Sequence, residues 1–227
     1  MLLFFGIIVI VLVAGVVSYV VGQQRIRDMR TFAAAHALTV IGSRWDLGDC
    51  GFSLFDMGNR RSWRNVLRGT WGGLPVTYCD YTYVQQSGRN TETFSFSNVI
   101  SPLGMQMPWV TVTPRSAIGV LAERSVGAPG IRFESIDFND HYDVHASDEA
   151  FAVELIDAQM IETLLTLHGC HVVFGPEYLM VYRHRQPVTE IGAVFDATVA
   201  VARRIPALVR AQSTVPSPVA DPSSPAV

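Results

Sequence analysis

The amino-terminal segment carries no charged side chain from Met1 to Gln24, and this constrains the fold more than any other feature. Within it, the apolar run Leu2 to Val21 is uninterrupted. About 20 helical residues, each rising ~1.5 Å, span the ~30 Å hydrocarbon core of a bilayer. Backbone groups in lipid must be hydrogen-bonded within the segment, so such a run is helical there. The sequence therefore predicts a single-pass anchor over residues 1–24 that contacts the lipid bilayer through Leu2–Val21.

The charges that flank this run predict its orientation. Arg25, Arg27 and Arg30 follow it, and no Lys or Arg precedes it. Positive charge stays on the cytoplasmic side of a membrane. A cleaved signal peptide is the rival interpretation, but it needs a basic start and a small-x-small cleavage site, and Val21-Gly22-Gln23-Gln24 is a poor one. We expect a cell-membrane protein with its main domain in the cytoplasm.

Composition narrows the classes of partner. The chain has a formal net charge of −3, and nucleic-acid binding needs a clustered basic face, so nucleic acid is not expected as a partner. Its three cysteines, Cys50, Cys79 and Cys170, are odd in number and far apart. A disulfide framework would need a denser, even set, so free thiols in a reducing compartment are the simpler interpretation.

The rest of the chain divides into three parts. Residues 25–40 have good helix formers and no Gly or Pro, which predicts a helical stalk. Residues 41–211 are long enough for one domain with its own core. Residues 212–227 are rich in Pro and Ser with little apolar bulk, which is typical of a disordered tail.

The predicted domain begins with strands. Gly72-Gly73 separates two strand-like runs, residues 64–71 and 74–85, and two glycines between such runs indicate a hairpin. Further strands are expected over 91–100, 109–113, 131–135 and 142–146, and a second hairpin over 171–183. Both faces of the run over 74–85 are mixed, so the alternation does not say which face is buried.

Helices complete the predicted domain. A short helix is expected over 116–124, a longer one from a Ser147 cap to Gly169, and a last one from a Thr189 cap, with Pro206 kinking or ending it. Strands and helices do not alternate regularly. The expected fold class is α+β: a transmembrane helix followed by one domain with a mainly antiparallel sheet covered by two longer helices.

The strongest candidate for chemistry is the trio His141, Asp143 and His145. If these residues share a strand, they lie on one face at period two, and an imidazole–carboxylate–imidazole set suits zinc or iron. An ordinary solvated strand face shows the same pattern, and we expect no bound metal or other cofactor.

Three further groups are weaker candidates. His168, Cys170 and His171 follow a predicted helix end and could hold a metal or a thiolate, although Cys is usually a core residue. Arg203, Arg204 and Arg210 make the last helix basic and could contact an anionic leaflet. An aromatic set could line a pocket or fill the core: Trp71, Tyr78, Tyr81, Tyr83, Phe94 and Phe96.

Several short stretches resemble an uncharacterised bacterial family of single-pass membrane-anchored proteins. They are Arg64–Thr70, Phe133–Asn139, Tyr142–Val144, Asp148–Ala152 and Arg204–Pro206, which occur over residues 60 to 210. The resemblance implies a folded domain behind an anchor. It assigns no activity and transfers no catalytic residue.

These observations favour a membrane-tethered cytoplasmic interaction module without catalytic activity. It would act through lipid or through a protein partner that the sequence does not identify. The alternative is an enzyme or small-ligand-binding domain that uses the aromatic sheet or the face of His141, Asp143 and His145. Whether the chain is an enzyme stays open, with a non-catalytic role preferred.

Overall fold

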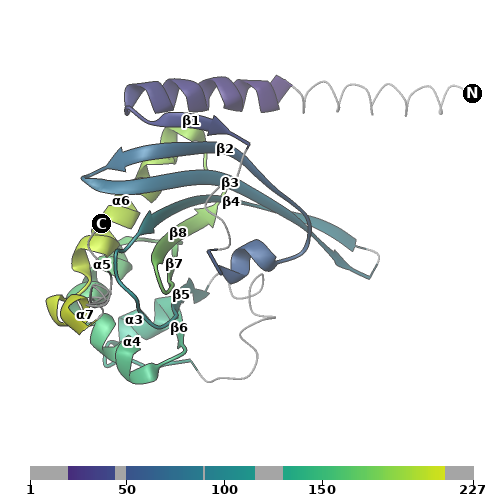
Figure 1. Ribbon diagram of the computed structural model, residues 1–227. Coiled ribbons are helices and arrows are strands. Elements are labelled where there is room, and N and C mark those ends of the chain that lie inside the picture. Colours follow the sequence, from purple (N-terminus) through teal and green to yellow (C-terminus); the bar gives the residue numbers. More distant parts are fainter. Residues whose placement is uncertain (1–19, 44–49, 89, 116–129, 213–227) are drawn as a thin grey trace, which may run out of the picture.

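The computed structural model describes residues 20–43, 50–88, 90–115 and 130–212. Its centre is an eight-stranded antiparallel sheet with the order β1-β2-β3-β4-β8-β7-β5-β6 (Figure 1). The strands are β1 (Thr39–Gly42), β2 (Asn59–Trp71), β3 (Leu74–Ser87), β4 (Asn90–Pro102), β5 (Val110–Pro114), β6 (Tyr142–Ala146), β7 (His171–Phe174) and β8 (Tyr178–His184). The expected α+β class with a mainly antiparallel sheet is confirmed.

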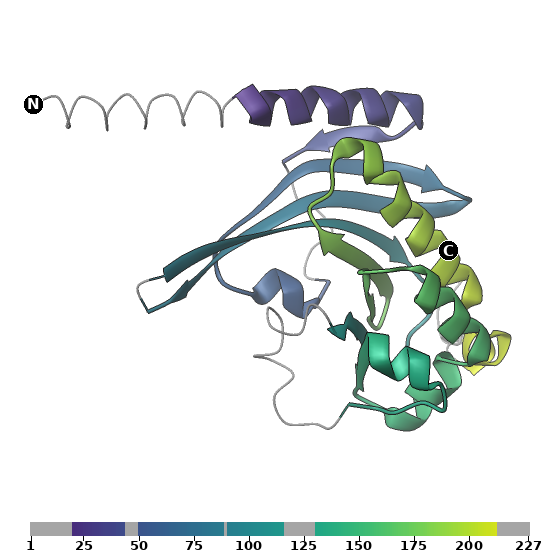
Figure 2. The same ribbon diagram turned by 180° about the vertical axis from the view of Figure 1, so that it is seen from behind.

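The helices gather on one face of this sheet (Figure 2). The first is the amino-terminal helix, described over residues 20–35. The others are η1 (Ser53–Asp56), α3 (Ile136–His141), α4 (Glu149–Leu155), α5 (Ala158–Thr166), η3 (Val188–Glu190), α6 (Gly192–Arg204) and α7 (Ala207–Gln212). Among the described residues, only the 3-10 helix η1 packs on the opposite face, where it buries Leu54 and Phe55.

The sheet is buried on both faces, which explains why its alternation was ambiguous. Tyr78 on β3 packs with Phe195 of α6 in the core under the helices. Tyr81 and Tyr83 occupy odd-numbered positions of β3 and therefore face the side opposite to Tyr78. They belong to a second core, in which Tyr81 contacts Phe55. The aromatic set expected from the sequence is thus divided between two filled cores and does not line one pocket.

The two predicted hairpins are confirmed. Trp71 pairs with Leu74 across Gly72 and Gly73, whose positive φ angles of 53° and 84° suit glycine. Phe174 pairs with Leu179 in the β7–β8 hairpin.

Two predicted elements were wrong, and so was the start of a third. The helix expected between Ser147 and Gly169 is two helices, because Ile156 leaves helical geometry and the Asp157 carboxylate caps a new start by accepting from the Met160 amide. Asp148, not Ser147, caps the first of them. Residues 131–135 are not a strand. The last predicted helix is confirmed as α6, which ends before Pro206, but it begins at Gly192 after the short η3 and not from a Thr189 cap.

Other expectations concern residues outside the described ranges. The anchor run Leu2–Val21 lies outside them except for its last two residues, as do the helix expected over 116–124 and the tail after 212. Among the described residues, no helix is both long and apolar enough to cross a membrane.

The amino-terminal helix lies along the sheet instead of standing apart as a stalk. Met29 and Ala33 are 1% exposed and belong to the core under the helices. The chain then turns directly into β1, so residues 25–40 are part of the domain. The reason is the apolar stripe of this helix, which continues the core cluster that includes Leu67 and Tyr78.

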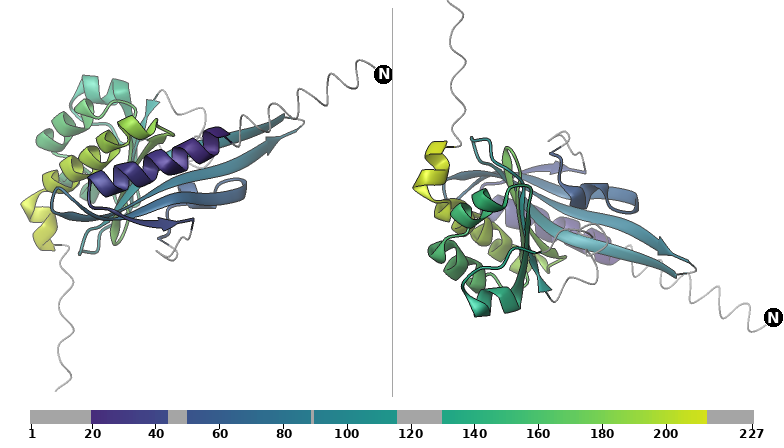
Figure 3. Two further views of the ribbon diagram at one scale, coloured as in Figure 1. Left: turned by 90° about the horizontal axis from the view of Figure 1, so that it is seen from above. Right: turned by 90° about the horizontal axis from the view of Figure 1, so that it is seen from below.

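The helix also has a defined direction on the sheet. His36 near its end contacts Trp71 beside the β2–β3 turn, with ring centroids 4.6 Å apart. Arg25 near its start contacts Asp80 in the middle of β3. The helix therefore runs antiparallel to β3, and its amino end points the same way as the β3–β4 hairpin (Figure 3).

Candidate functional site

A groove of about 940 Å³ lies between the first half of the amino-terminal helix and the sheet, around the contacts that join them. It is larger than a shallow depression of about 610 Å³ between α5 and α6. Its walls come from the helix, β1 to β4 and the residue after β8: Gly22, Gln23, Ile26, Met29, Arg30, Val40, Gly42, Ser43, Ser62, Trp63, Arg64, Asn65, Leu67, Asp80, Thr82, Thr93, Ser95 and Arg185. Its size falls within the range of known ligand pockets.

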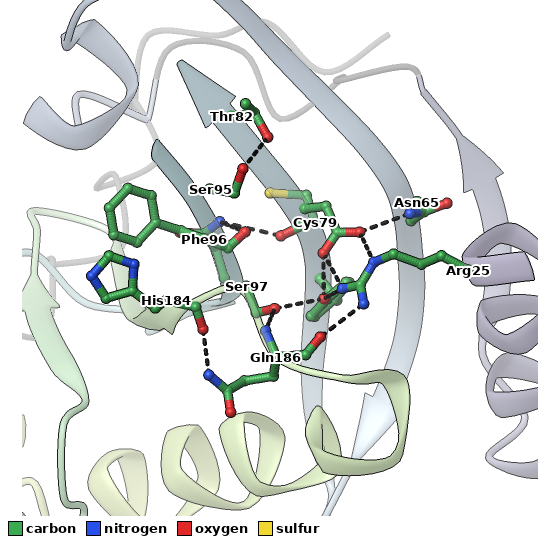
Figure 4. A network of polar contacts seen from close by, with 12 residues as sticks. Arg25, Asn65, Cys79, Thr82, Ser95, Phe96, Ser97, His184 and Gln186 are labelled. Atoms are coloured by element: carbon green, nitrogen blue, oxygen red, sulfur yellow. Dashed lines mark hydrogen bonds and ion pairs between the residues drawn. The ribbon is translucent and has the colours of Figure 1, made fainter. Parts of the chain in front are cut away.

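The groove floor holds a buried carboxylate, Asp80, whose side chain is 5% exposed. Arg25 grips it with two hydrogen bonds, from Nε to Oδ2 at 2.8 Å and from Nη2 to Oδ1 at 2.7 Å (Figure 4). Asn65 Nδ2 donates to Oδ2 at 2.7 Å, and the Tyr78 hydroxyl donates to Oδ1 at 2.7 Å. Both carboxylate oxygens are therefore satisfied, as burial of a charge requires.

Local backbone geometry places Asn65 in this set. The β2–β3 register shifts between Arg64 and Leu67, which marks a bulge. Asn65 lies in that bulge with a φ of 50°, a left-handed conformation that Asn tolerates better than most residues. The bulge turns the Asn65 amide toward Asp80 on the neighbouring strand.

The network extends to the backbone beyond β8. Arg25 Nη1 donates to the Gln186 carbonyl at 2.8 Å, and the Gln186 amide donates to Ser97 Oγ at 3.1 Å. Ser97 Oγ lies 3.0 Å from the Tyr78 hydroxyl. We call Arg25, Asn65, Tyr78, Asp80, Ser97 and Gln186 the arginine clasp, because it fastens the amino-terminal helix to the sheet.

The electrostatics of the clasp favour a permanent ion pair. Burial opposes the charge of Arg25, but its hydrogen bonds and attraction to Asp80 outweigh this and raise its pKa. Burial, and then the neighbouring Asp80 charge, raises the pKa of Tyr78 well above its usual value, so Tyr78 remains a neutral donor. The clasp is thus a structural fastener, with its donors and acceptors matched.

The rim of the groove has a different character. Arg30, Arg64 and Arg185 are exposed, and their side chains form no hydrogen bond or ion pair with any described residue. The apolar wall of the groove is Ile26 and Val40, which are exposed, with Met29 and Leu67 buried behind them. Asp80 is the one acidic residue among the described groove residues, and Arg25 neutralises it. The groove therefore presents net positive charge beside an apolar strip.

The trio His141, Asp143 and His145 does not share a strand. His141 ends α3, where its Nδ1 lies 2.8 Å from the Asp137 carbonyl, because β6 begins only at Tyr142. Asp143 and His145 do meet, with 2.8 Å between His145 Nε2 and Asp143 Oδ2. Within the described ranges, no group of three or more His, Cys, Asp or Glu side chains is arranged to hold a metal ion.

Cys170 and His171 belong to the core. Burial raises the pKa of the Cys170 thiol, which disfavours a thiolate. His171 is 2% exposed and stacks on Tyr182, with ring centroids 4.4 Å apart. Burial, and then the nearby His184, lowers the pKa of His171 to about 3. His168 is exposed and separate from them.

The basic residues expected on the last helix, Arg203 and Arg204 on α6 and Arg210 on α7, do not line the groove. Arg203 Nη2 donates to the Gly72 carbonyl at 2.7 Å, beside the β2–β3 turn. Arg204 reaches Gln159 Oε1 at 3.4 Å, and Arg210 Nε donates to the Ile205 carbonyl at 3.3 Å. Gly72 and Gly88 mark opposite ends of β3, whose 14 residues extend roughly 45 Å.

Sequence reasoning missed the groove and the clasp. In the sequence, Arg25 has a local explanation as a charge that flanks the apolar run, and Asp80 is one polar residue in a run whose two faces are both mixed. An aspartate in mid-strand between Tyr78 and Thr82 was the available signal, because Asp is depleted from strands. Its partner is 55 residues away in the chain, beyond any local pattern.

The sequence matches no family model, and no curated protein matches it. Among solved structures, the chain is similar to the crystal structure of the mycobacterial trehalose monomycolate transport factor A, TtfA. The TM-score is 0.53 at 13% sequence identity, and the match covers 85% of this chain and 96% of that one. At this identity, the similarity shows a shared fold.

Proposed function

We propose that the protein is a membrane-tethered interaction module without catalytic activity, held at the cytoplasmic face by Leu2–Val21. The supporting observation is the arginine clasp. The clasp fastens the helix described over residues 20–35, which follows the apolar run in the sequence, to the sheet. It does so through the Arg25–Asp80 ion pair, whose side chains are 11% and 5% exposed. A clasped helix gives the domain one orientation relative to its tether, where a free stalk would give many.

In this proposal, the end of the domain that carries the amino end of the helix faces the bilayer. The amino end of the helix and the β3–β4 hairpin point the same way (Figure 3). Arg203 lies toward the opposite end, where it donates to Gly72 in the β2–β3 turn, and the end of α6 and α7, which carry Arg204 and Arg210, lie on that side as well (Figure 3). In the proposed arrangement these three arginines face the cytoplasm, so we no longer propose them as lipid contacts.

The alternative of an enzyme or small-ligand-binding domain loses its two expected sites. The aromatic side chains fill two cores, and His141 is separated from Asp143 and His145. TtfA, a similar protein of known structure, is by its name a transport factor for trehalose monomycolate. The similarity assigns no residue, no cargo and no role to this chain. The family of anchored bacterial proteins stays an expectation from the sequence.

Reporter fusions to the carboxy terminus of the full chain test the tether and its orientation. We expect activity from a reporter that works only in the cytoplasm and none from one that works only after export, because the basic flank stays inside. Replacing Arg27 and Arg30 by Gln should weaken this preference and leave Arg25 in the clasp. An active exported reporter on the unmodified chain would overturn both the orientation and the cytoplasmic role.

A further inference from the structure

The rim arginines and the apolar wall of the groove form two adjoining surfaces with different ligand preferences. Arg30, Arg64 and Arg185 line the groove from the helix, from β2 and from the end of β8. Ile26 and Val40 also line it, and they are 36% and 42% exposed although both are apolar. Unpaired guanidinium groups favour carboxylate or phosphate, and exposed apolar side chains favour a hydrocarbon partner.

We propose that this groove binds an anionic membrane lipid, with the headgroup at Arg30, Arg64 and Arg185 and an acyl chain along the apolar wall. The proposal rests on the membrane tether proposed above. Charge complementarity selects the headgroup, because the described groove residues carry three unpaired cations and no unpaired acid. The hydroxyl groups of Thr82, Thr93 and Ser95 add further polar contacts along β3 and β4.

The position of the groove argues for lipid over a soluble anion or an acidic peptide. Gly22 and Gln23 line it, and they follow directly after the apolar run Leu2–Val21. The opening therefore lies at the end of the domain nearest the proposed bilayer, where lipid is the most concentrated amphiphile. Arg25 is excluded as a headgroup ligand because Asp80, Tyr78 and Gln186 already accept from it.

Photolabelling of the full chain tests this inference. The protein, in micelles of a non-ionic detergent, is exposed to an anionic phospholipid with a photoreactive group on its acyl chain, or to a neutral phospholipid with the same chain. Labelled peptides are mapped by mass spectrometry. We expect the anionic lipid to label the groove segments around Ile26, Val40 and Leu67, and the neutral lipid to label them far less. Both lipids should label residues 2–21, which serve as the internal reference.

Matched variants separate the groove from general charge. Arg64→Gln with Arg185→Gln should weaken groove labelling by up to roughly thirty-fold, since each exposed ion pair with the headgroup contributes up to ~1 kcal/mol and ~1.4 kcal/mol is tenfold. Arg64→Lys with Arg185→Lys should retain most of it, which excludes loss of folding. Arg203→Gln with Arg204→Gln removes the same charge from the distal end and should leave groove labelling unchanged.

Three outcomes would overturn the inference. They are equal groove labelling by both lipids, labelling that ignores the Arg64 and Arg185 changes, and complete protection by soluble glycerol phosphate at the lipid's own concentration. The last would mean that the acyl chain contributes nothing and that a soluble phosphate is the ligand. Absence of label from residues 2–21 with both lipids would instead refute the tether, so the two failures are distinguishable.

Discussion

Replacing Arg25 by Met is the most direct perturbation of the arginine clasp. The substitution removes both hydrogen bonds to Asp80 and those to Tyr78 and Gln186, while the Met side chain retains most of the apolar stem. Asp80 stays buried with only Asn65 and Tyr78 as donors among the described side chains. Breaking a buried ion pair by removing one partner costs about 3–5 kcal/mol. Because two donors remain, we expect the lower end, about 3 kcal/mol in the free energy of unfolding.

The pairwise coupling is the sharper measurement. Asp80→Asn should cost a similar amount, because it leaves the Arg25 guanidinium, 11% exposed, without its counter-charge. The double variant removes both charges, so it should be less destabilised than the sum of the single variants by about 2 kcal/mol. Urea unfolding of the full chain in non-ionic detergent gives the free energies. Hydrogen exchange of the amides in residues 25–35 shows whether the helix detaches first.

An exposed ion pair supplies the control for this cycle. Arg61 and Asp56 lie 3.3 Å apart with side chains 41% and 63% exposed, and exposed pairs contribute about 0–1 kcal/mol. Asp56→Asn should therefore have little effect. If the effects of Arg25→Met and Asp80→Asn simply add to within ~0.5 kcal/mol, or if either is silent, the clasp does not hold the helix as described.

Two further changes test the cores. The pKa of His171 is about 3 in the folded protein and ordinarily ~6.5, so between these pH values only the unfolded chain binds the proton. The free energy of unfolding is therefore highest above pH ~6.5 and falls as the pH is lowered. Between about pH 7 and pH 5, His171 should lower the free energy of unfolding by ~2 kcal/mol. His171→Phe should make the free energy of unfolding depend less on pH, whereas the exposed control His168→Asn should not. Phe195→Ala should lower the free energy of unfolding in urea by about 3–5 kcal/mol, because Phe195 is fully buried against Trp71 and Tyr78. The control Val153→Ala, at a residue 52% exposed, should change it by no more than ~0.5 kcal/mol. No effect of Phe195→Ala would mean that α6 does not cover the sheet.

Much of the fold could be predicted from local patterns. The Gly72-Gly73 turn, the alternation over β4, the β7–β8 hairpin and the apolar stripe of α6 each depend on residues close together in the chain. Local rules failed where two interpretations of the same stretch compete. Residues 136–141 form α3 because Ser135 caps it, accepting from the Phe138 amide, and this moved His141 away from the strand that holds Asp143 and His145.

The candidate groove could not be predicted, for a different reason. Its defining contacts join residues from distant parts of the chain, such as Arg25 with Asp80 and Gln186. The position of Arg25 directly after the apolar run already explains its charge, so nothing in the local pattern indicates a second role. The helix over 20–35 was likewise predicted correctly as a helix, but its docking depends on the surface formed later by β1, β2 and β3.

The direction of the amino-terminal helix also determines how the domain would bear mechanical tension. The helix runs antiparallel to β3, and Arg25 joins the two near the middle of the strand. A force applied at the amino end of the helix acts along its axis, so it loads the Arg25–Asp80 contact in shear. Contacts loaded in shear must yield together, whereas contacts that are peeled yield one after another. Tension on the chain before Val20 would therefore reach the centre of the sheet first through the Arg25 side chain. The buried side chains of Met29 and Ala33 would resist the same force further along the helix.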